Sequence, residues 1–479
     1  MTPPLLIDGA LVCDEGAART GSVLVRGGLI DAVATYGEDR AALRSRAGEI
    51  VTGSGRWLMP GLIDAHAHAY STLLRGTENS LPLELWALHT MLYGRGFDVR
   101  LLRTAILLGA AERIRAGITG MVDHSPPNQL GLASIAAHEE SGMRVAYAAF
   151  LHDLSDYDLL DMSLPPDVAA AVGAPPPLDE EAYARRFASF VQAARAGSGR
   201  VQVQLGPNAP QRCSPRAWAL WRTLRDRHDV AVHTHLLETR AQASLNRRWP
   251  GGLVAEMARE GLLEGRLTCA HGVWLTDAER DVLARCGVTV SHNPASNLML
   301  GSGVMNFRSC TACGLCLALG TDSANTGGRH DIFGVMRLAM MLPRVNDPAT
   351  AHWPDAAQVF DAATLGGAAA LGMKGRLGRI APGQRADFVL VRAGDAGTIA
   401  AEPSVAALVQ HGGPENVDAV MVDGRWVLRE GRIVAFDEDA VRRGAVTLAY
   451  ELHDRVAAAL PALRATIPPL AARLAGLCG

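Results

Sequence analysis

Eight short apolar runs, separated by Ala/Leu/Arg-rich segments of helical period, occupy the middle of the chain. Runs this apolar and this short are typical of strands buried on both faces of a parallel sheet. Eight such strands alternating with helices predict a fold of the α/β class, a (β/α)8 TIM barrel. The runs are residues 57–68, 117–124, 143–152, 201–207, 229–235, 266–271, 288–292 and 316–322.

The two ends of the chain have a different pattern. Residues 1–56 and 376–436 hold short alternating runs broken by Gly and Asp-Gly turns, as in antiparallel sheets. Because neither segment has enough strands for its own core, we expect both to combine into one small β-sandwich domain. On this interpretation the barrel spans residues 57–375, and the Ala/Leu/Arg-rich segment 437–479 is helical.

Polar side chains close nearly every apolar run of the predicted barrel. The carboxyl ends of the strands of a TIM barrel meet on one face, so residues far apart in the sequence can surround one site there. We therefore expect these side chains to lie close together. They are His66, His68, His124, His152, Asn208, His235, His271, His292 and Asp322.

Several of these residues are of the types that bind metal ions. His66 and His68 are two positions apart at a strand end, so both imidazoles should face the same point. Taken alone, this pair also fits two hydrogen-bonded interior histidines. Asp322 follows an apolar strand directly, where a carboxylate is seldom left unpaired. Together these strand ends supply three imidazole nitrogens and one carboxylate for an ion, and they leave one further acid and one further histidine beside it. The six residues are His66, His68, His235, Glu238, His271 and Asp322.

The basic residues exclude several chemistries, because Lys374 is the single lysine among 46 basic residues. Schiff-base and pyridoxal-phosphate enzymes need a lysine amine, and phosphate-binding loops of the GK[ST] type need a lysine beside their glycines. A carbamylated lysine that bridges two metal ions needs one inside the site. Lys374 lies in a glycine-rich connector and fits none of these roles.

Charge and hydropathy limit the partners and the cellular location that we expect for the protein. The net charge of −3 gives no field to attract nucleic acid. The start of the sequence lacks the pattern of a signal peptide, and no apolar run is long enough for a membrane span. Eight cysteines in so long a chain are no disulfide framework. We expect a cytoplasmic protein, without nucleic-acid or membrane partners, that forms a homo-oligomer.

The order of the motifs GLIDAHAH, HTHLLE, CAH, SHNPASNLMLGSG and LGTDS resembles the amidohydrolase superfamily over essentially the whole chain. The similar branch holds the mononuclear metal-dependent cytosine, guanine and S-adenosylhomocysteine deaminases and the triazine chlorohydrolases. The resemblance implies one divalent ion, zinc most often, with iron as the alternative. The ligands that it implies are His66, His68, His235 and Asp322.

The same resemblance implies roles for the neighbouring residues. Glu238 would carry a proton to the substrate, His271 would orient the nucleophile, and Asp322 would accept its proton. A divalent ion lowers the pKa of a bound water from about 15.7 towards about 7, which supplies that nucleophile. Binuclear relatives carry a lysine on the fourth strand, where this chain reads VQVQLGPNAP. The absence of lysine there favours the mononuclear branch.

The implied reaction is release of ammonia from an amino-substituted nitrogen heterocycle, a small-molecule substrate. Displacement of chloride or alkylamine from a triazine ring, or opening of a cyclic amide or imine, uses the same site chemistry and stays open. A catalytically inactive scaffold is the remote alternative, because no residue of the ligand set is missing.

The substrate-binding residues are predicted from their places after strand ends. Relatives that deaminate S-adenosylhomocysteine often carry histidine at the position of Asn208 and glutamate at that of Arg95, so the substituent on the ring stays open. The predicted substrate-binding residues are Arg75, Glu78, Trp86, Asn208, Gln211, His292, Asn297 and Ser302.

Other candidates receive supporting roles. His233 should face inward beside the ligands, and His124 and His152 should form hydrogen-bonded pocket walls. His330 and Asp331 are expected to shape the mouth of the pocket. The thiols of Cys310, Cys313 and Cys316 lack a fourth metal partner in local spacing and are interpreted as packed in the core.

Overall fold

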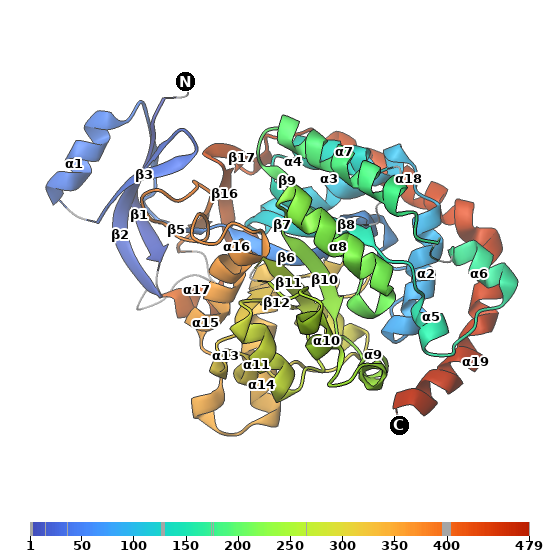
Figure 1. Ribbon diagram of the computed structural model, residues 1–479. Coiled ribbons are helices and arrows are strands. Elements are labelled where there is room, and N and C mark those ends of the chain that lie inside the picture. Colours follow the sequence, from blue (N-terminus) through green and yellow to red (C-terminus); the bar gives the residue numbers. More distant parts are fainter. Residues whose placement is uncertain are drawn as a thin grey trace.

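The computed structural model describes residues 3–14, 16–35, 37–125, 130–173, 175, 177–264, 266–394 and 404–478. A ring of parallel strands forms its centre (Figure 1). The eighth predicted run is divided into β13 and β14, and β14 pairs in parallel with β6, so the ring closes. The predicted barrel is confirmed. Its strands are β6 (Leu62–His68), β7 (Ile118–Ser125), β8 (Arg144–Leu151), β9 (Val201–Pro207), β10 (Val232–Leu236), β11 (Leu267–His271), β12 (Thr289–His292), β13 (Cys316–Leu319) and β14 (Asp322–Ser323).

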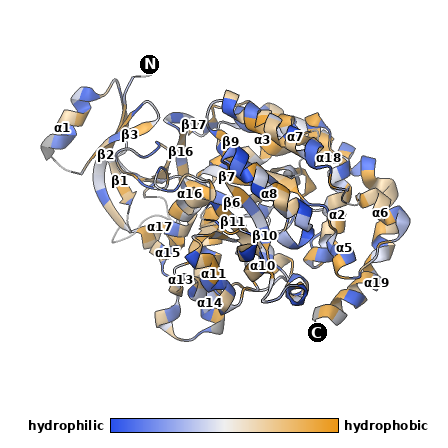
Figure 2. Ribbon diagram, viewed as in Figure 1, coloured by the Kyte–Doolittle hydropathy of each residue, from blue (hydrophilic) through white to orange (hydrophobic). Residues whose placement is uncertain are grey.

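Helices surround the barrel strands. Those at the surface, such as α8, carry many hydrophilic residues (Figure 2), and their apolar sides pack on the strands. The helices along this part of the chain are α2 (Leu83–Arg95), α3 (Val99–Arg115), α4 (Gly131–Ser141), α5 (Asp156–Leu159), α6 (Pro166–Val172), α7 (Glu180–Ala196), α8 (Pro215–His228), α9 (Arg240–Ser244), α10 (Leu253–Arg259), α11 (Asp277–Arg285), α12 (Pro294–Met299), α13 (Phe307–Ala312), α14 (Ile332–Asn346), α15 (Ala356–Asp361) and α16 (Gly367–Ala370).

A bulge in β6 sets the direction of the first two histidines. The pairing of β6 with β7 shifts register between Asp64 and Ala67. Ile63 and Ala65 therefore pack in an interior cluster of small apolar side chains, yet His66 also points into the barrel. A bulge inserts one residue, so the side chains after it point to the other side of the strand. Strand β6 can therefore contribute both to the apolar interior of the barrel and to the site.

The two ends of the chain form one nine-stranded sheet. Strand β15 pairs antiparallel with β5, with Leu390 opposite Leu58, so the predicted small β domain built from both ends is confirmed. Ile7 packs in the core of this sheet, and Leu6 on the opposite face packs against Leu43 of α1 (Gly37–Arg46). The strands are β1 (Leu5–Asp14), β2 (Ala17–Arg26), β3 (Leu29–Ala34), β4 (Glu49–Thr52), β5 (Arg56–Pro60), β15 (Phe388–Arg392), β16 (Val417–Val422), β17 (Arg425–Arg429) and β18 (Arg432–Ile433).

The first predicted run, residues 57–68, does not form a single barrel strand. It divides at Gly61, where β5 ends in the terminal sheet and β6 begins in the barrel. A Cβ atom on Gly61 would lie only 2.0 Å from the hydroxyl of Thr119 in β7. Only glycine therefore lets the chain pass this close to β7. The change of sheet is invisible in the apolar pattern because both halves are buried.

Two long helices end the described chain. α18 (Glu438–Val456) packs on α3, and α19 (Leu460–Cys478) packs on α2, α6 and α9. With α5 they bury a second apolar cluster, which contains Leu85, Tyr157 and Leu463. α17 (Val405–His411) contacts α14 and α15. None of the described helices has the length and hydropathy needed to cross a membrane.

Candidate metal centre

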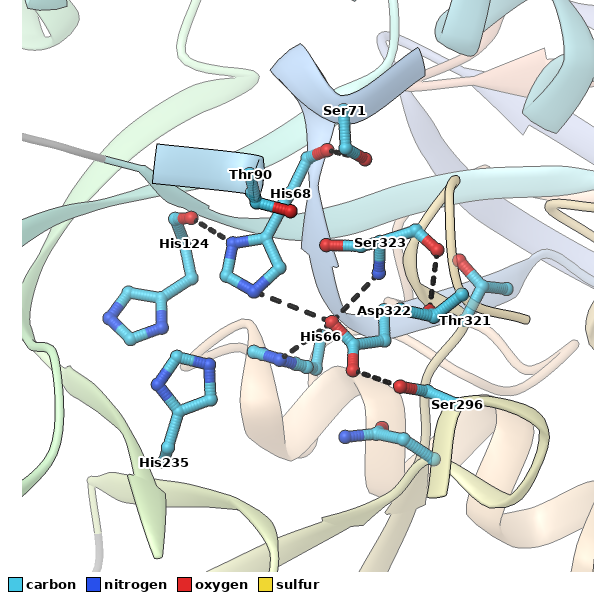
Figure 3. A network of polar contacts seen from close by, with 12 residues as sticks. His66, His68, Ser71, Thr90, His124, His235, Ser296, Thr321, Asp322 and Ser323 are labelled. Atoms are coloured by element: carbon cyan, nitrogen blue, oxygen red, sulfur yellow. Dashed lines mark hydrogen bonds and ion pairs between the residues drawn. The ribbon is translucent and has the colours of Figure 1, made fainter. Parts of the chain in front are cut away.

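Three strands bring the four predicted ligands to one place at the carboxyl end of the barrel strands. His66 and His68 come from β6, His235 from β10, and Asp322 from β14 (Figure 3). The possible ligand atoms of His66, His68 and Asp322 lie within 4.8 Å of one another, as do those of His66, His235 and His271. The structure thus brings together the residues that the strand-end pattern predicted to be neighbours.

The carboxylate of Asp322 lies at the centre of this group. Its Oδ1 is 3.5 Å from His66 Nε2 and 3.4 Å from His68 Nε2. Ser296 donates its hydroxyl to Oδ2 at 2.6 Å, and the backbone amide of Ser323 donates to Oδ1 at 2.7 Å. Asp322 has a φ of 62°, a conformation rare for residues other than glycine, so the surrounding contacts must hold it in place.

Backbone carbonyls fix the imidazole rings. His68 Nδ1 donates to the carbonyl of His124 at 2.5 Å, and His235 Nδ1 donates to the carbonyl of Asn208 at 2.5 Å. A proton on Nδ1 leaves the lone pair of Nε2 free, which is the arrangement of histidines that bind metals. The expectation for His233 also holds in geometry, since its Nε2 lies 2.8 Å from Nδ1 of His66.

Burial favours the neutral forms of the His66 and His235 rings. It lowers the pKa of His66 well below the ordinary value, and neighbouring His68 lowers it further. Burial likewise lowers the pKa of His235, with His66 and His68 adding to the effect. Asp322 behaves in the opposite sense, because burial opposes its charge but His271 and His68 hold its pKa below the ordinary value. Neutral imidazoles beside a carboxylate are the protonation states that a divalent cation requires.

The residues present fit such a cation. Three imidazole nitrogens and one carboxylate suit zinc and similar divalent ions. His66 Nε2 is buried and has no hydrogen-bond partner in the described part of the chain, although buried polar atoms are nearly always paired. A bond to a metal ion would satisfy this atom.

Glu238 lies beside the predicted ligands, and its carboxylate groups with His271 and Asp322. Its Oε2 lies 3.5 Å from His271 Nε2, and Ser302 donates its hydroxyl to Oε1 at 3.4 Å. Burial raises the pKa of Glu238 well above the ordinary value, and the negative charges of Asp322 and Glu84 raise it further. Such a carboxyl group holds a proton more readily than an exposed one and can deliver it to a substrate.

His271 connects the two carboxylates. Its Nε2 is 3.8 Å from Asp322 Oδ2, and its Nδ1 lies 2.9 Å from Asn297 Oδ1. His271 has a φ of 74° and Leu237, before Glu238, has a φ of 45°. Left-handed backbone at non-glycine residues is uncommon and clusters at functional sites.

Most predicted substrate-binding residues lie near this centre or on the elements that form it. Ser302 contacts Glu238, Asn297 contacts His271, and Asn208 contacts His235. Four of the predicted residues are buried and keep a side-chain nitrogen or oxygen without a partner among the described residues, which leaves it available to a ligand. These four are Trp86, Gln211, His292 and Asn297.

Arg75 and Glu78 are placed elsewhere. A 3-10 helix, Ala69–Leu74, follows β6 and directs Arg75 toward α3, where it forms an ion pair with Glu112. Arg75 lines a separate pocket of about 330 Å³ together with His330 and Asp331, which were expected at the pocket mouth. Glu78 accepts hydrogen bonds from the amide and hydroxyl of Ser80, each at 2.7 Å. These contacts place both residues apart from the metal centre, and their predicted role in substrate binding stays a prediction.

The predicted pocket walls and the cysteines have clear places. The ring of His124 lies 4.7 Å from that of His235, and the ring of His152 lies 6.1 Å from that of Phe150. Cys310 is buried in the main core, and Cys313 donates its thiol to the Cys310 carbonyl. The contacts of Cys310 and Cys313 are those of thiols packed at the core.

Sequence reasoning missed Glu84, Asp156, Arg212 and Thr239. Glu84 and Thr239 form a buried hydrogen bond, and Arg212 pairs with Asp156. All four follow strand ends, so position alone could have suggested them, but acidic and basic residues in loops are usually solvated. Their partners lie in other loops, and no local spacing reveals the pairs.

A closed (β/α)8 barrel with a histidine and carboxylate centre at its catalytic face defines a metal-dependent hydrolase of the TIM-barrel class. The model of the Amidohydrolase family matches residues 57–427, and the chain belongs to this family, as its motifs predicted.

The chain is 32% identical over 453 residues to the 5′-deoxyadenosine deaminase of Methanothermobacter thermautotrophicus, covering 94% of this chain and 98% of the relative. It is 31% identical over 461 residues to the 5-methylthioadenosine/S-adenosylhomocysteine deaminase of Desulforudis audaxviator, covering 94% and 100%.

Two solved structures extend the comparison. An adenosine deaminase from Xanthomonas campestris with bound zinc aligns with a TM-score of 0.83 at 28% identity, over 94% of this chain and 98% of that one. Atrazine chlorohydrolase from Arthrobacter aurescens, in complex with zinc, aligns with a TM-score of 0.82 at 22% identity, over 93% and 100%. The second likeness concerns the fold alone.

Proposed function

We propose that the chain is a divalent-metal-dependent aminohydrolase that releases ammonia from an amino-substituted nitrogen heterocycle, with 6-aminopurine nucleosides as the first candidates. The observation that carries the proposal is the position of Glu238, buried beside the proposed ligands and 3.5 Å from His271. The named activities of the relatives from Methanothermobacter and Desulforudis support the substrate class.

His66, His68, His235 and Asp322 would hold the ion, which we propose is zinc because its site suits imidazole nitrogens and one carboxylate. The zinc bound in the adenosine deaminase from Xanthomonas campestris supports this choice. When bound, the ion supplies an activated water as the nucleophile.

The protein's own groups then move the protons. Asp322 Oδ2 lies beside His271 and accepts a proton from the attacking water, while His271 holds the nucleophile in line. Glu238 gives its proton to the ring nitrogen next to the carbon that is attacked. A positioned acid or base of this kind contributes a factor of about 10²–10⁴ to the rate.

The overall reaction is a hydrolysis. The water oxygen forms a bond to the ring carbon, and the bond from that carbon to the amino nitrogen breaks. The amino group takes the one proton that Asp322 accepted from the water and leaves as ammonia, while the ring nitrogen keeps the proton from Glu238. The second water proton, lost from the added hydroxyl, restores Glu238 to its protonated form. The ring keeps a carbonyl oxygen, and no oxidant or reductant is consumed.

The test measures ammonia release by the metal-loaded enzyme from a panel of aminated rings, which includes adenosine, 5′-deoxyadenosine, 5′-methylthioadenosine, adenine, guanine and cytosine. We expect turnover on at least one nucleoside, with a product whose mass is about one dalton higher, as replacement of an amino group by an oxo group requires. Silence on every aminated ring, at full metal content, would rule out the proposal. Chloride release from a chlorotriazine would point to the alternative leaving group instead.

A further inference from the structure

A cluster of buried polar side chains lies on the catalytic face beside the metal centre. We call Glu84, Asp156, Asn208 and Arg212 the polar cluster. Glu84 is in the first turn of α2, Asp156 begins α5, and Asn208 and Arg212 follow β9. Each follows the carboxyl end of a barrel strand, where the substrate-binding loops of TIM-barrel enzymes lie.

Hydrogen bonds connect the polar cluster to both parts of the catalytic machinery. Arg212 Nη1 donates to Asn208 Oδ1 at 2.7 Å, and the Asn208 carbonyl receives His235 Nδ1 at 2.5 Å. On the other side, the hydroxyl of Thr239, the residue after Glu238, donates to the Glu84 carboxylate. The polar cluster therefore contacts His235, a predicted ligand, directly. It also contacts Thr239, the residue next to Glu238, the proposed proton carrier.

The ion pair at the heart of the polar cluster is incomplete. Arg212 Nη2 contacts Asp156 Oδ2, but neither Arg212 Nε nor Asp156 Oδ1 has a hydrogen-bond partner within the described ranges. The Asp156 side chain is 5% exposed and that of Arg212 is 24% exposed. Burying an ion pair is costly unless its remaining donors and acceptors are satisfied, so the open atoms call for a ligand group or ordered water.

An open donor and an open acceptor on one ion pair match a specific chemical group. A hydroxyl both donates and accepts a hydrogen bond, whereas a ring carbonyl only accepts and an ammonium only donates. The reacting edge of the ring is already matched by Glu238 and the ligand set. The polar cluster is therefore available to bind a substituent of the ring.

We propose that Arg212 and Asp156 are specificity-determining residues that bind a hydroxyl-bearing substituent of the substrate, a sugar attached to the heterocycle. Asn208 holds the Arg212 side chain in place through their hydrogen bond. The proposal rests on the proposed aminohydrolase function and adds which part of the substrate this chain selects, and by which residues.

The test compares two substrates with the same ring, 5′-deoxyadenosine and adenine, on the metal-loaded enzyme. We expect Asp156→Asn and Arg212→Gln to lower kcat/KM for the nucleoside by about 10- to 100-fold, mainly through KM, as loss of a charge-assisted hydrogen bond does. The value for adenine should change by less than about threefold. Arg216→Gln, on the exposed side of α8 and paired with Glu180, is the matched control and should leave both values unchanged.

Metal content and thermal midpoint, measured for each variant, identify any variant that fails to fold. Since a folding defect lowers both substrates alike, the ratio of the two kcat/KM values remains decisive, and Arg212→Lys should restore part of it. An unchanged ratio in both variants would overturn this inference while leaving deamination intact. If the wild-type enzyme releases ammonia from neither substrate nor from the wider panel, the proposed function fails and this inference falls with it.

Discussion

The carboxylate of Asp64 accepts two hydrogen bonds from Thr321, one from its backbone amide at 2.8 Å and one from its hydroxyl at 2.7 Å. Thr321 directly precedes Asp322, whose backbone is in the left-handed region. Arg113 of α3 also donates its Nε to Asp64 at 2.9 Å, and both side chains of this ion pair are fully buried. Asp64 therefore fixes the segment that presents Asp322 and offsets the charge of Arg113.

Removing this carboxylate should destabilise the fold. In Asp64→Ala, Arg113 stays buried without its counter-ion, and breaking a buried pair in this way costs about 3–5 kcal/mol of the free energy of unfolding. Denaturant unfolding followed by circular dichroism would measure the loss. Glu140→Ala breaks the exposed pair with Arg103 and should cost no more than about 1 kcal/mol. Equal losses in the two variants would contradict the role given to Asp64.

Glu238→Gln separates proton transfer from metal binding. Because Glu238 carries a proton and is not a proposed ligand, the variant should keep its metal and lose kcat by at least about 100-fold. Steady-state kinetics and elemental analysis of the same preparation check both parts. Glu181→Gln, on an exposed side chain of α7, should behave as wild type. A metal-free Glu238→Gln protein would show instead that Glu238 is a ligand.

His66→Ala should lose the ion itself. The variant removes the buried Nε2 that has no protein partner in the described structure, so the metal content after exhaustive dialysis should fall from about one ion per chain to near zero. His292→Ala is the matched control, because His292 is equally buried but belongs to none of the candidate metal clusters of the described residues. Full metal retention by His66→Ala would remove it from the ligand set.

Arg75→Ala should leave catalysis nearly unchanged. Its guanidinium pairs with Glu112 at the separate pocket, so kcat/KM is expected to stay within about threefold of wild type. A loss of a hundredfold or more, with an unchanged thermal midpoint, would return Arg75 to the substrate pocket.

The terminal sheet should lose stability in acid through Asp8. A side-chain hydrogen bond from Arg40, aided by Ser22 and by the charge of Arg44, lowers the pKa of Asp8 from 3.8 to about 2. A depressed pKa means that this contribution to stability is complete above about pH 4 and is lost as the pH falls towards 2. Thermal midpoints of wild type and Asp8→Asn should therefore differ at pH 5 and converge near pH 2. A constant difference across this range would assign the effect to packing.

Much of the grouping of the residues at the metal centre was predictable because polar side chains recur at the ends of successive apolar strands. His66, His235 and Asp322 end apolar strands, and parallel strands in a barrel bring such ends together whatever lies between them. The bulge in β6 and the division of residues 57–68 at Gly61 were not predictable, since both depend on neighbours that no local pattern records.

The missed residues and those that lie apart from the centre share one physical reason. Arg75 comes after a barrel strand, yet a short 3-10 helix stands between them and directs Arg75 toward α3. Arg212 and Asp156 lie in different loops, and the sequence does not reveal that one neutralises the other. Loop side chains take their direction from tertiary contacts, which is why strand ends were easier to predict than the substrate wall.

The pairing of β5 with β15 has a consequence for the way the protein is made. On a translating ribosome β5 emerges well before β15–β18, while the whole barrel is still to be synthesised. Until then one edge of β5 has no strand beside it, and its apolar residues Trp57, Leu58 and Met59 lack most of their final cover. Unpaired edges of this kind invite aggregation. The free edge of β5 is therefore a site at which the nascent chain can aggregate until β15 arrives to pair with it.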